Sequence, residues 1–255
     1  MTDLEKINAY VESHRDEMLE TYRKVILQES YHSAPEEVRT MGKMFKEMFE
    51  EVGFRCKLTN VGTDESGDML TGILGEDRPG KPIIFGGHMD TVHKLGSFPC
   101  KFEVDDEGKV HGPGVLDMKG GIVIALYVCK ALNEIGYNSR PLKICFAPDE
   151  EKLHKHGNTA DQFLEFCKGG EFMLNMETGL PGGDLCVSRK GKTEVALYVE
   201  GVSAHAGNDF ARGRNAIAEL CKKVTDIQAL TNIDVGTTVC VDVIHGGTNF
   251  GAFPA

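Results

Sequence analysis

The chain up to residue 189 contains three short apolar runs, at residues 82–87, 141–147 and 171–176. Each run is too short for a buried helix and is bounded by glycine, proline or charged residues, which is typical of a strand buried on both faces. Segments with helical periodicity, residues 119–134 and 160–167, separate the runs. Strands that alternate with helices predict an α/β domain with a mainly parallel sheet.

The segments before the first of these runs predict two helices and two further strands. Residues 4–30 follow an amphipathic helical pattern. Ser33 is expected to cap a second helix, because Glu36 follows three residues later in a capping-box arrangement. Strand-like segments come next, at residues 54–60 and 69–74, joined by a turn rich in Gly, Asp and Ser.

The pattern changes near Arg189. Residues 192–201 and 237–244 alternate between polar and apolar positions like half-exposed strands, and residues 215–230 between them form an amphipathic helical pattern. This β-α-β piece predicts the start of a smaller α+β domain. Its apolar faces would lack partners, so we expect the sequence to stop within that domain. The predicted domains are residues 1–189 and 190–255.

Composition places the chain among ordinary globular proteins. Of its 255 residues, 41% are hydrophobic and 26% charged, enough to build a real core. The formal net charge of −11 argues against a nucleic-acid partner, because an acidic surface repels phosphate. No apolar run approaches the roughly 20 residues that span a membrane, and the charged N-terminal segment lacks a signal-peptide pattern. We therefore expect a cytoplasmic protein without membrane contact.

The eight cysteines are scattered and show no CxxC spacing. In a chain without a secretory signal, free buried thiols are favoured over disulfides, and a cysteine-based zinc site is not expected. They are Cys56, Cys100, Cys129, Cys145, Cys167, Cys186, Cys221 and Cys240.

His88 and Asp90 follow the first buried run, in the motif GGHMDTV. Ligand sites in open α/β sheets gather at the carboxyl ends of strands. Two residues apart in extended chain, both side chains point to the same side, and a carboxylate beside a histidine is a common metal-site arrangement. A structural hydrogen bond made by a strand-end histidine is the alternative.

Asp117 lies in a glycine-rich loop, GPGVLDMKGG, just before a predicted helix. Simple capping of the helix would also explain an acid at this position. The glycine spacing does not fit a dinucleotide-binding fingerprint, and the Gly-Lys-Ser/Thr of a P-loop is missing.

Further carboxylates follow the other two buried runs. Asp149, Glu150 and Glu151 come directly after residues 141–147, and Glu177 follows the third run. Successive acids repel one another, so a cation or solvent must compensate them. A solvated acidic loop is one reading, but the strand-end position favours a metal. Histidine, Asp and Glu are the nitrogen and oxygen ligands of catalytic zinc.

Two histidines lie in the second predicted domain. His205 occurs in SAHAG after an alternating strand, and His245 occurs at the end of the next one. As isolated histidines, both are more typical of structural roles.

The motifs GGHMDTV, GPGVLDMKGG, DEE, METG and GVSAHAG, in this order, resemble metallopeptidase family twenty of clan MH. This group includes aminoacylase, acetylornithine deacetylase, succinyl-diaminopimelate desuccinylase and glutamate carboxypeptidase. The resemblance covers essentially the whole chain and implies a zinc-peptidase-like catalytic domain with an inserted lid, or dimerisation, domain. It implies hydrolysis of peptide or N-acyl-amino-acid amide bonds.

The resemblance also implies two divalent metal ions, most often zinc, with cobalt and manganese as alternatives. His88 and Glu177 would bind the first metal, Glu151 would bind the second, and Asp117 would bridge the two. The peptide bond that follows the bridging aspartate is often cis in the family.

Three other residues take catalytic roles by the same resemblance. Asp90 would stand behind His88, and Glu150 would be the general base that takes a proton from water. His205 would come from the lid of a homodimer, reach the active site of a partner subunit and help to stabilise the oxyanion.

The sequence departs from the family in two respects. The last metal ligand of the family is a histidine near the C-terminus of the complete chain, and this sequence ends before it. The slot of a family asparagine that contacts substrate holds Gly251. Two hypotheses follow. The chain is a fragment of an intact enzyme and inactive alone, or it is a non-catalytic remnant that binds metal weakly or pairs through its lid strands.

Overall fold

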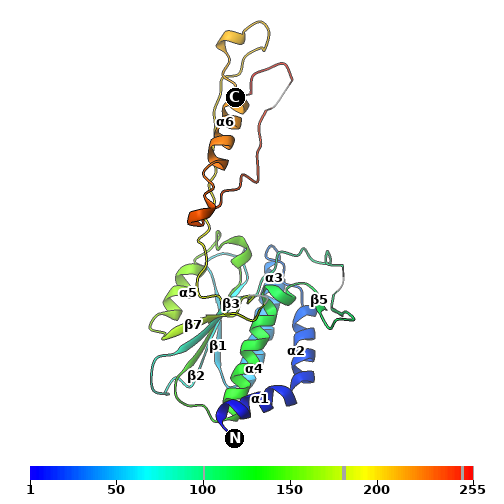
Figure 1. Ribbon diagram of the computed structural model, residues 1–255, viewed down its shortest axis with the longest axis vertical. Coiled ribbons are helices and arrows are strands. Elements are labelled where there is room, and N and C mark those ends of the chain that lie inside the picture. The colour runs from blue at the N-terminus through cyan, green and yellow to red at the C-terminus, as the bar shows by residue number, and fades with distance from the viewer. Residues whose placement is uncertain (100, 180–181, 248–249, 255) are drawn as a thin grey trace. The chain divides into compact units, whose positions relative to one another are not determined.

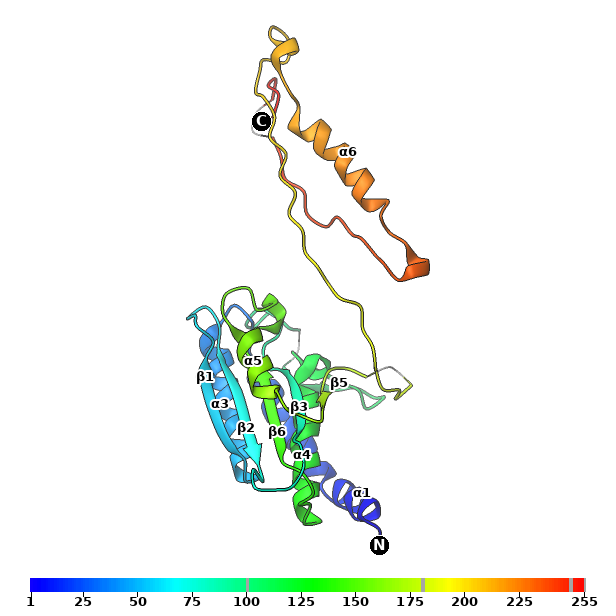
Figure 2. The same cartoon turned by 90° about the vertical axis from the view of Figure 1, so that its left-hand side faces the viewer.

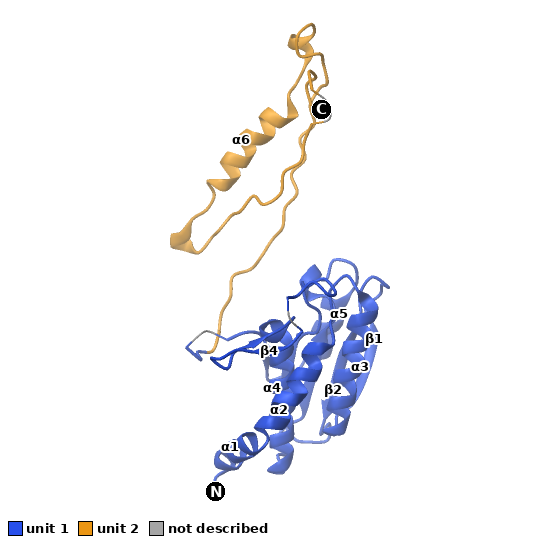
Figure 3. Ribbon diagram, turned by 90° about the vertical axis from the view of Figure 1, so that its right-hand side faces the viewer, with its two compact units in different colours: residues 1–184 blue, residues 185–255 orange. Residues whose placement is uncertain are grey.

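The structure, a computed structural model, describes residues 1–99, 101–179, 182–247 and 250–254. It divides into two compact units, Met1–Asp184 (unit 1) and Leu185–Ala255 (unit 2), shown in Figure 3. The sequence pattern places the change a little later, near Arg189.

Unit 1 is built on a five-stranded sheet with the order β1-β2-β6-β3-β7 (Figure 1). β6 runs parallel to β3 and β3 parallel to β7, whereas β2 is antiparallel to both of its neighbours, so four of the five strands point the same way. The predicted α/β fold with a mainly parallel sheet is confirmed. The strands are β1 (Arg55–Asn60), β2 (Asp68–Leu74), β3 (Ile83–His88), β6 (Leu142–Ala147) and β7 (Phe172–Asn175), and a separate hairpin holds β4 (Glu103–Val104) and β5 (Val110–His111).

Helices cover both faces of this sheet, as Figures 1 and 2 show. Successive residues of a strand point to opposite faces, and neighbouring core residues of β6 divide in this way. Ile144 and Phe146 join the large core with α1 to α4, while Cys145 packs on the other face with Phe163 and Phe166 of α5. The helices are α1 (Asp3–Ser13), α2 (Arg15–Leu27), α3 (Pro35–Glu51), α4 (Gly120–Glu134) and α5 (Thr159–Cys167).

Three local predictions for unit 1 are wrong. The segment expected as one helix forms two, which meet at His14. α3 is capped by Ala34 without a side-chain bond, because the Ser33 hydroxyl lies 2.9 Å from Nδ1 of His32 instead. β7 was expected to be buried on both faces, but it is the edge strand, and its four residues are exposed.

Unit 2 contains one long helix, α6 (Ala216–Gln228), and two short turns of helix, η3 (Phe210–Arg212) and η4 (Ile233–Val235). The predicted helix is confirmed, but the two predicted strands, residues 192–201 and 237–244, are wrong: the chain there forms no strand. An alternating pattern describes which side chains face a core, whereas a strand also requires a neighbouring backbone to bond. Only isolated bridges occur in the described part of this unit.

Two expectations about the environment of the chain can be compared with the structure. The seven cysteines within the described residues are free thiols, as expected, while Cys100 lies outside them. The expectation of burial holds only for two cysteines of unit 1, Cys129 and Cys145. Cys56 and Cys167 are partly buried, and the three described cysteines of unit 2 are exposed. Within the described residues, no helix combines the length and the apolar character needed to cross a membrane.

Candidate metal centre

The candidate site lies where β6, β3 and β7 end side by side. His88 is the last residue of β3 and is in register with Ala147, the last residue of β6. Gly86 of β3 is paired with Asn175 at the end of β7. Because the three strands are parallel, the acids that follow β6 and β7 lie at the same edge of the sheet as His88. Sheet topology therefore brings together three of the four predicted motifs of unit 1, and the fourth, around Asp117, lies in the turn before α4.

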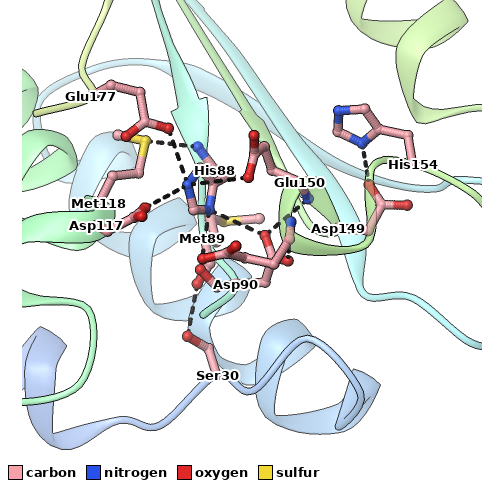
Figure 4. A network of polar contacts seen from close by, with 11 residues as sticks. Ser30, His88, Met89, Asp90, Asp117, Met118, Asp149, Glu150, His154 and Glu177 are labelled. Carbon is pink, nitrogen blue, oxygen red and sulfur yellow. Dashed lines mark hydrogen bonds and ion pairs between the residues drawn. The ribbon is translucent and has the colours of Figure 1, made fainter. Parts of the chain in front are cut away.

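Four carboxylates surround the imidazole of His88, which is 1% exposed (Figure 4). Its Nε2 atom lies 3.0 Å from Oδ1 of Asp117, 3.1 Å from Oε1 of Glu177 and 3.8 Å from Oε2 of Glu150. Its Nδ1 atom lies 3.2 Å from Oδ1 of Asp90. One imidazole nitrogen is thus directed at three acids, and the other is held by a fourth.

Asp90 is fully buried and connects two parts of the site. Its Oδ1 atom accepts the backbone N–H of Glu150, and its Oδ2 atom accepts that of Glu151, both at 3.1 Å. These residues begin η2 (Glu150–Lys152), the short turn after β6. Asp90 therefore orients His88 on β3 and also anchors the turn that carries the acids after β6.

Asp117 lies in η1 (Val115–Lys119), the irregular turn that leads into α4. The peptide bond between Asp117 and Met118 is cis, as the family resemblance implied. Met118 is buried beneath the site, and its Sδ atom accepts the backbone N–H of His88 at 3.0 Å. Lys119 is also buried and donates from Nζ to the carbonyl oxygen of Gln28 at 2.7 Å. The two residues that follow Asp117 in this turn are therefore fixed by the protein interior.

The acids of the site alter one another's protonation. Burial lowers the pKa of His88, but its bonds to Asp117, Asp90 and Glu177 outweigh this effect and raise it to about 12. Burial, followed by the nearby carboxylates, raises the pKa of Glu150 and raises that of Glu151 to about 7. Such shifts arise when several negative charges share a partly buried space without enough positive charge.

This donor set fits divalent cations. Two groups of side chains place potential ligand atoms within 4.8 Å of one another: His88 with Asp117 and Glu177, and His88 with Glu150 and Glu151. Imidazole nitrogen and carboxylate oxygen are ligands that zinc, manganese and cobalt accept. Within the described residues, neither group includes a second histidine.

A polar network beside the site was not anticipated from the sequence. Asp149 is 1% exposed and faces His154 at 2.7 Å, while it accepts the hydroxyls of Thr159 at 3.0 Å and Ser66 at 3.2 Å. The sequence showed it only as the first acid of three. The sequence offered one signal, its place shortly after a buried strand, and Glu150 and Glu151 share that place.

His205, the remaining predicted site residue, belongs to unit 2. It is exposed, and its Nδ1 atom accepts the backbone N–H groups of Gly207 and Asn208, both at 3.1 Å. These bonds shape its own loop. Gly251 has a left-handed backbone with φ of +80°, which glycine adopts freely and asparagine tolerates better than most residues.

Comparison with known proteins identifies relatives over much of the chain. It is 27% identical over 205 residues to carboxypeptidase G2 of Pseudomonas sp. (strain RS-16), covering 79% of this chain and 48% of that protein. It is 27% identical over 176 residues to succinyl-diaminopimelate desuccinylase of Rickettsia rickettsii (strain Sheila Smith), covering 62% of this chain and 45% of that protein. The chain thus spans about half the length of these curated relatives.

Solved structures share the fold. A tripeptidase from Staphylococcus aureus superimposes with a TM-score of 0.68 at 18% identity, covering 93% of this chain and 62% of that one. An M20 family metallo-carboxypeptidase from Sulfolobus solfataricus gives a TM-score of 0.62 at 16% identity, covering 83% and 49%. Residues 84–246, which include every predicted site residue, match the family described as Peptidase family M20/M25/M40. The chain belongs to peptidase family M20/M25/M40.

Proposed function

We propose that this chain carries the metal-binding part of a two-metal hydrolase that cleaves amide bonds in peptides or N-acyl amino acids. One observation supports this most directly: Asp90, Glu150 and Glu177, which follow three parallel strands, converge on the buried imidazole of His88. Carboxylates gathered in this way repel one another, and a bound cation would compensate their charge. Membership of the peptidase family agrees with the chemistry that these groups offer.

The ligands divide between two positions. His88 and Glu177 would hold the first cation, Glu151 would hold the second, and Asp117 would be shared between them. Zinc is the expected metal, and cobalt or manganese can replace it, because the ligands are nitrogen and oxygen atoms. When bound, the cations supply Lewis acidity toward the scissile carbonyl and acidify a water molecule.

Glu150 holds and transfers the proton. It is half-buried, its backbone is fixed by Asp90, and its Oε2 atom lies 3.8 Å from Nε2 of His88. Burial raises its pKa, which strengthens the carboxylate as a base. It takes a proton from the attacking water and delivers it to the leaving amine. Asp90 fixes the position of the imidazole of His88 relative to the backbone of Glu150.

The names of two relatives support a proposal for the substrate class. One relative is named as a carboxypeptidase and another as a desuccinylase. Both names describe cleavage of an amide in a molecule that carries a free carboxylate. We therefore propose a substrate in which a carboxylate lies near the scissile amide, such as an N-acyl amino acid or a short peptide.

Unit 2 is proposed as part of the lid of a homodimer, with His205 reaching the active site of the partner subunit to stabilise the oxyanion. Its exposed apolar residues, among them Val195, Val243 and Ile244, support a role in association. Location in the cytoplasm stays a prediction.

The decisive experiment uses the protein expressed from its complete reading frame and loaded with zinc, cobalt or manganese. A panel of N-acyl amino acids and dipeptides is assayed for release of the free amine. Glu150→Gln should lower kcat by a factor of about 10²–10⁴, because the amide cannot accept the proton. Bound metal, measured by elemental analysis, should not change.

Glu134→Gln is the matched control, since this exposed glutamate ends α4, at the opposite end of the helix from the turn that carries Asp117. It should leave kcat unaltered. Full activity of the Glu150→Gln variant would refute the assigned base. Absence of both metal binding and turnover in the parent protein would favour the competing hypothesis of a non-catalytic remnant.

A further inference from the structure

His154 is held in place by a buried carboxylate. Its Nδ1 atom lies 2.7 Å from Oδ1 of Asp149, which is itself fixed by the hydroxyls of Thr159 and Ser66. Because these bonds hold the carboxylate of Asp149 in place, the carboxylate determines the orientation of the His154 ring. Figure 4 shows the second ring nitrogen turned away from Asp149. It is this nitrogen that remains to contact a ligand.

The backbone accepts strain to place this ring. Leu153 and His154 both have φ of +55°, the left-handed region that residues with a Cβ rarely occupy. The pair is stabilised by backbone bonds from Leu153 to Glu150 at 2.7 Å and from His154 to Asp149 at 3.2 Å. Strain of this kind gathers at ligand sites, because folding alone does not require it.

The ring of His154 borders a hollow that reaches the metal centre. This hollow has a volume of about 640 Å³ and is lined by His88, Glu150 and Glu177 as well as by His154. Phe163 of α5 supplies part of its apolar wall, together with Met173 of β7. The hollow thus joins an apolar space to the reacting groups, with one imidazole at its border that no metal-ligand group includes.

We propose that His154 binds the carboxylate of the substrate while the scissile amide lies at the metal centre. The inference deepens the proposed function and rests on it. The other ionisable side chains that line the hollow near His88 are the acids Glu150 and Glu177, which repel a substrate carboxylate. With Nδ1–H donated to Asp149, the protonated ring offers Nε2–H to one carboxylate oxygen.

The electrostatics of the pair favour this protonated ring. The bond to Asp149 raises the pKa of His154, and the charges of Asp149, Asp90 and Glu150 act in the same direction against the effect of burial. Asp149 accepts the hydroxyls of Thr159 and Ser66 as well as the bond from His154, so its carboxylate is held in place for the ring. The side chain of His154 is 30% exposed, so an incoming ligand can reach it.

Equilibrium binding tests the role without depending on turnover. The probe is 2-benzyl-4-oxopentanoate, in which a CH₂ group replaces the amide nitrogen of N-acetylphenylalanine, and it is compared with its neutral carboxamide. Calorimetry with the zinc-loaded protein should show the carboxylate binding on the order of tenfold more tightly than the carboxamide. His154→Ala should remove this preference by weakening only the carboxylate, and His154→Lys should restore part of it.

His156→Ala is the matched control, because this neighbouring histidine pairs with Glu65 at 3.2 Å and is not among the lining residues of the hollow. It should leave both affinities unchanged. Equal weakening of the two probes by His154→Ala would assign the residue a structural role and overturn the proposal. So would a parent protein that binds neither probe, or binds both equally.

Hydrolysis of N-acetylphenylalanine by the same preparations separates this proposal from the proposed function. Turnover without a carboxylate preference retains the hydrolase and refutes the role of His154. A His154-dependent preference without turnover supports the binding role and refutes the hydrolase.

Discussion

Units 1 and 2 bury their apolar side chains to very different extents. Unit 1 encloses a large core in which side chains such as Phe45, Phe49 and Phe146 are fully buried. In the described part of unit 2, Ala216 is the one buried hydrophobic residue, whereas Val195 is 86% exposed. Both regions carry clear amphipathic patterns in the sequence. The difference therefore lies in whether the described residues include other helices and strands that cover these apolar faces.

Helices and strands respond differently to this lack of partners. α6 forms in unit 2 because a helix satisfies its backbone groups within one segment. Residues 192–201 and 237–244 have the pattern of strands but need a second backbone at hydrogen-bonding distance, and the structure gives them none within a regular ladder. In unit 1, β6 has such neighbours on both sides. A sequence that favours a strand thus forms one in unit 1, where neighbouring strands are present, and an irregular chain in unit 2.

The largest expected contrast is in stability. Phe146→Ala should lower the free energy of unfolding of unit 1 by about 3–5 kcal/mol, because it opens a cavity in a filled core. Val243→Ala in unit 2 should change it by less than about 0.5 kcal/mol, because that side chain is already 68% exposed. Urea titration followed by circular dichroism measures both. A similar loss from the two variants would show that unit 2 buries Val243 in solution.

The sequence was most informative where side-chain pattern and sheet topology act together. Parallel strands bring their carboxyl ends to one edge, so the position of His88, Glu150 and Glu177 after three strands was enough to predict their proximity. The sequence could not show that the hydroxyl of Ser33 contacts His32 instead of capping α3. The same side chain can make either bond, and only the local backbone decides between them.

The structural role of Asp149 was equally hidden in the sequence. Its partners Ser66 and Thr159 lie at other points of the chain, and only the folded structure brings them to one carboxylate. The exposure of β7 was missed for a related reason: its place at the edge depends on the order of strands in the sheet.

The second-largest contrast is expected from metal binding, which should stabilise unit 1 but not unit 2. Zinc at about 100 times its Kd should stabilise unit 1 by about 2.7 kcal/mol, since the ligand binds only the folded state. The stabilisation is read as a rise in the thermal midpoint of unit 1. His88→Ala should abolish it, because both ligand groups include this imidazole.

His205→Ala provides the comparison from unit 2. His205 accepts two backbone N–H groups in its own loop, so its loss should leave the zinc-dependent rise intact. If His205→Ala removed the rise, a metal ligand would have to be reassigned to unit 2.

A smaller effect is expected from Asp90→Asn, which keeps the shape of the side chain and removes its charge. Asp90 holds Nδ1 of His88 and receives two backbone N–H groups from η2. Loss of a carboxylate behind a ligating histidine lowers metal affinity by about 10–100-fold. Competition with a chromogenic chelator measures the change. An unaltered affinity would mean that the backbone carbonyl of Asp90, 3.1 Å from Nδ1, orients the ring alone.

The smallest effect is expected from removing helix caps, which tests whether a helix is held by its own hydrogen bonds or by contacts with the rest of its unit. Asn215 caps α6 by accepting the N–H of Ala218 at 3.0 Å, and Thr2 caps α1 in a capping box with Glu5. Removing either cap, by Asn215→Ala or Thr2→Ala, should cost about 1 kcal/mol. α1 packs against α4, and its Tyr10 lies against the core of unit 1, whereas Ala216 is the one buried residue of α6. Hydrogen exchange should therefore accelerate throughout α6 in Asn215→Ala but only near the first turn of α1 in Thr2→Ala. Equal, local fraying of both helices would show that α6 is held by contacts as well as by its cap.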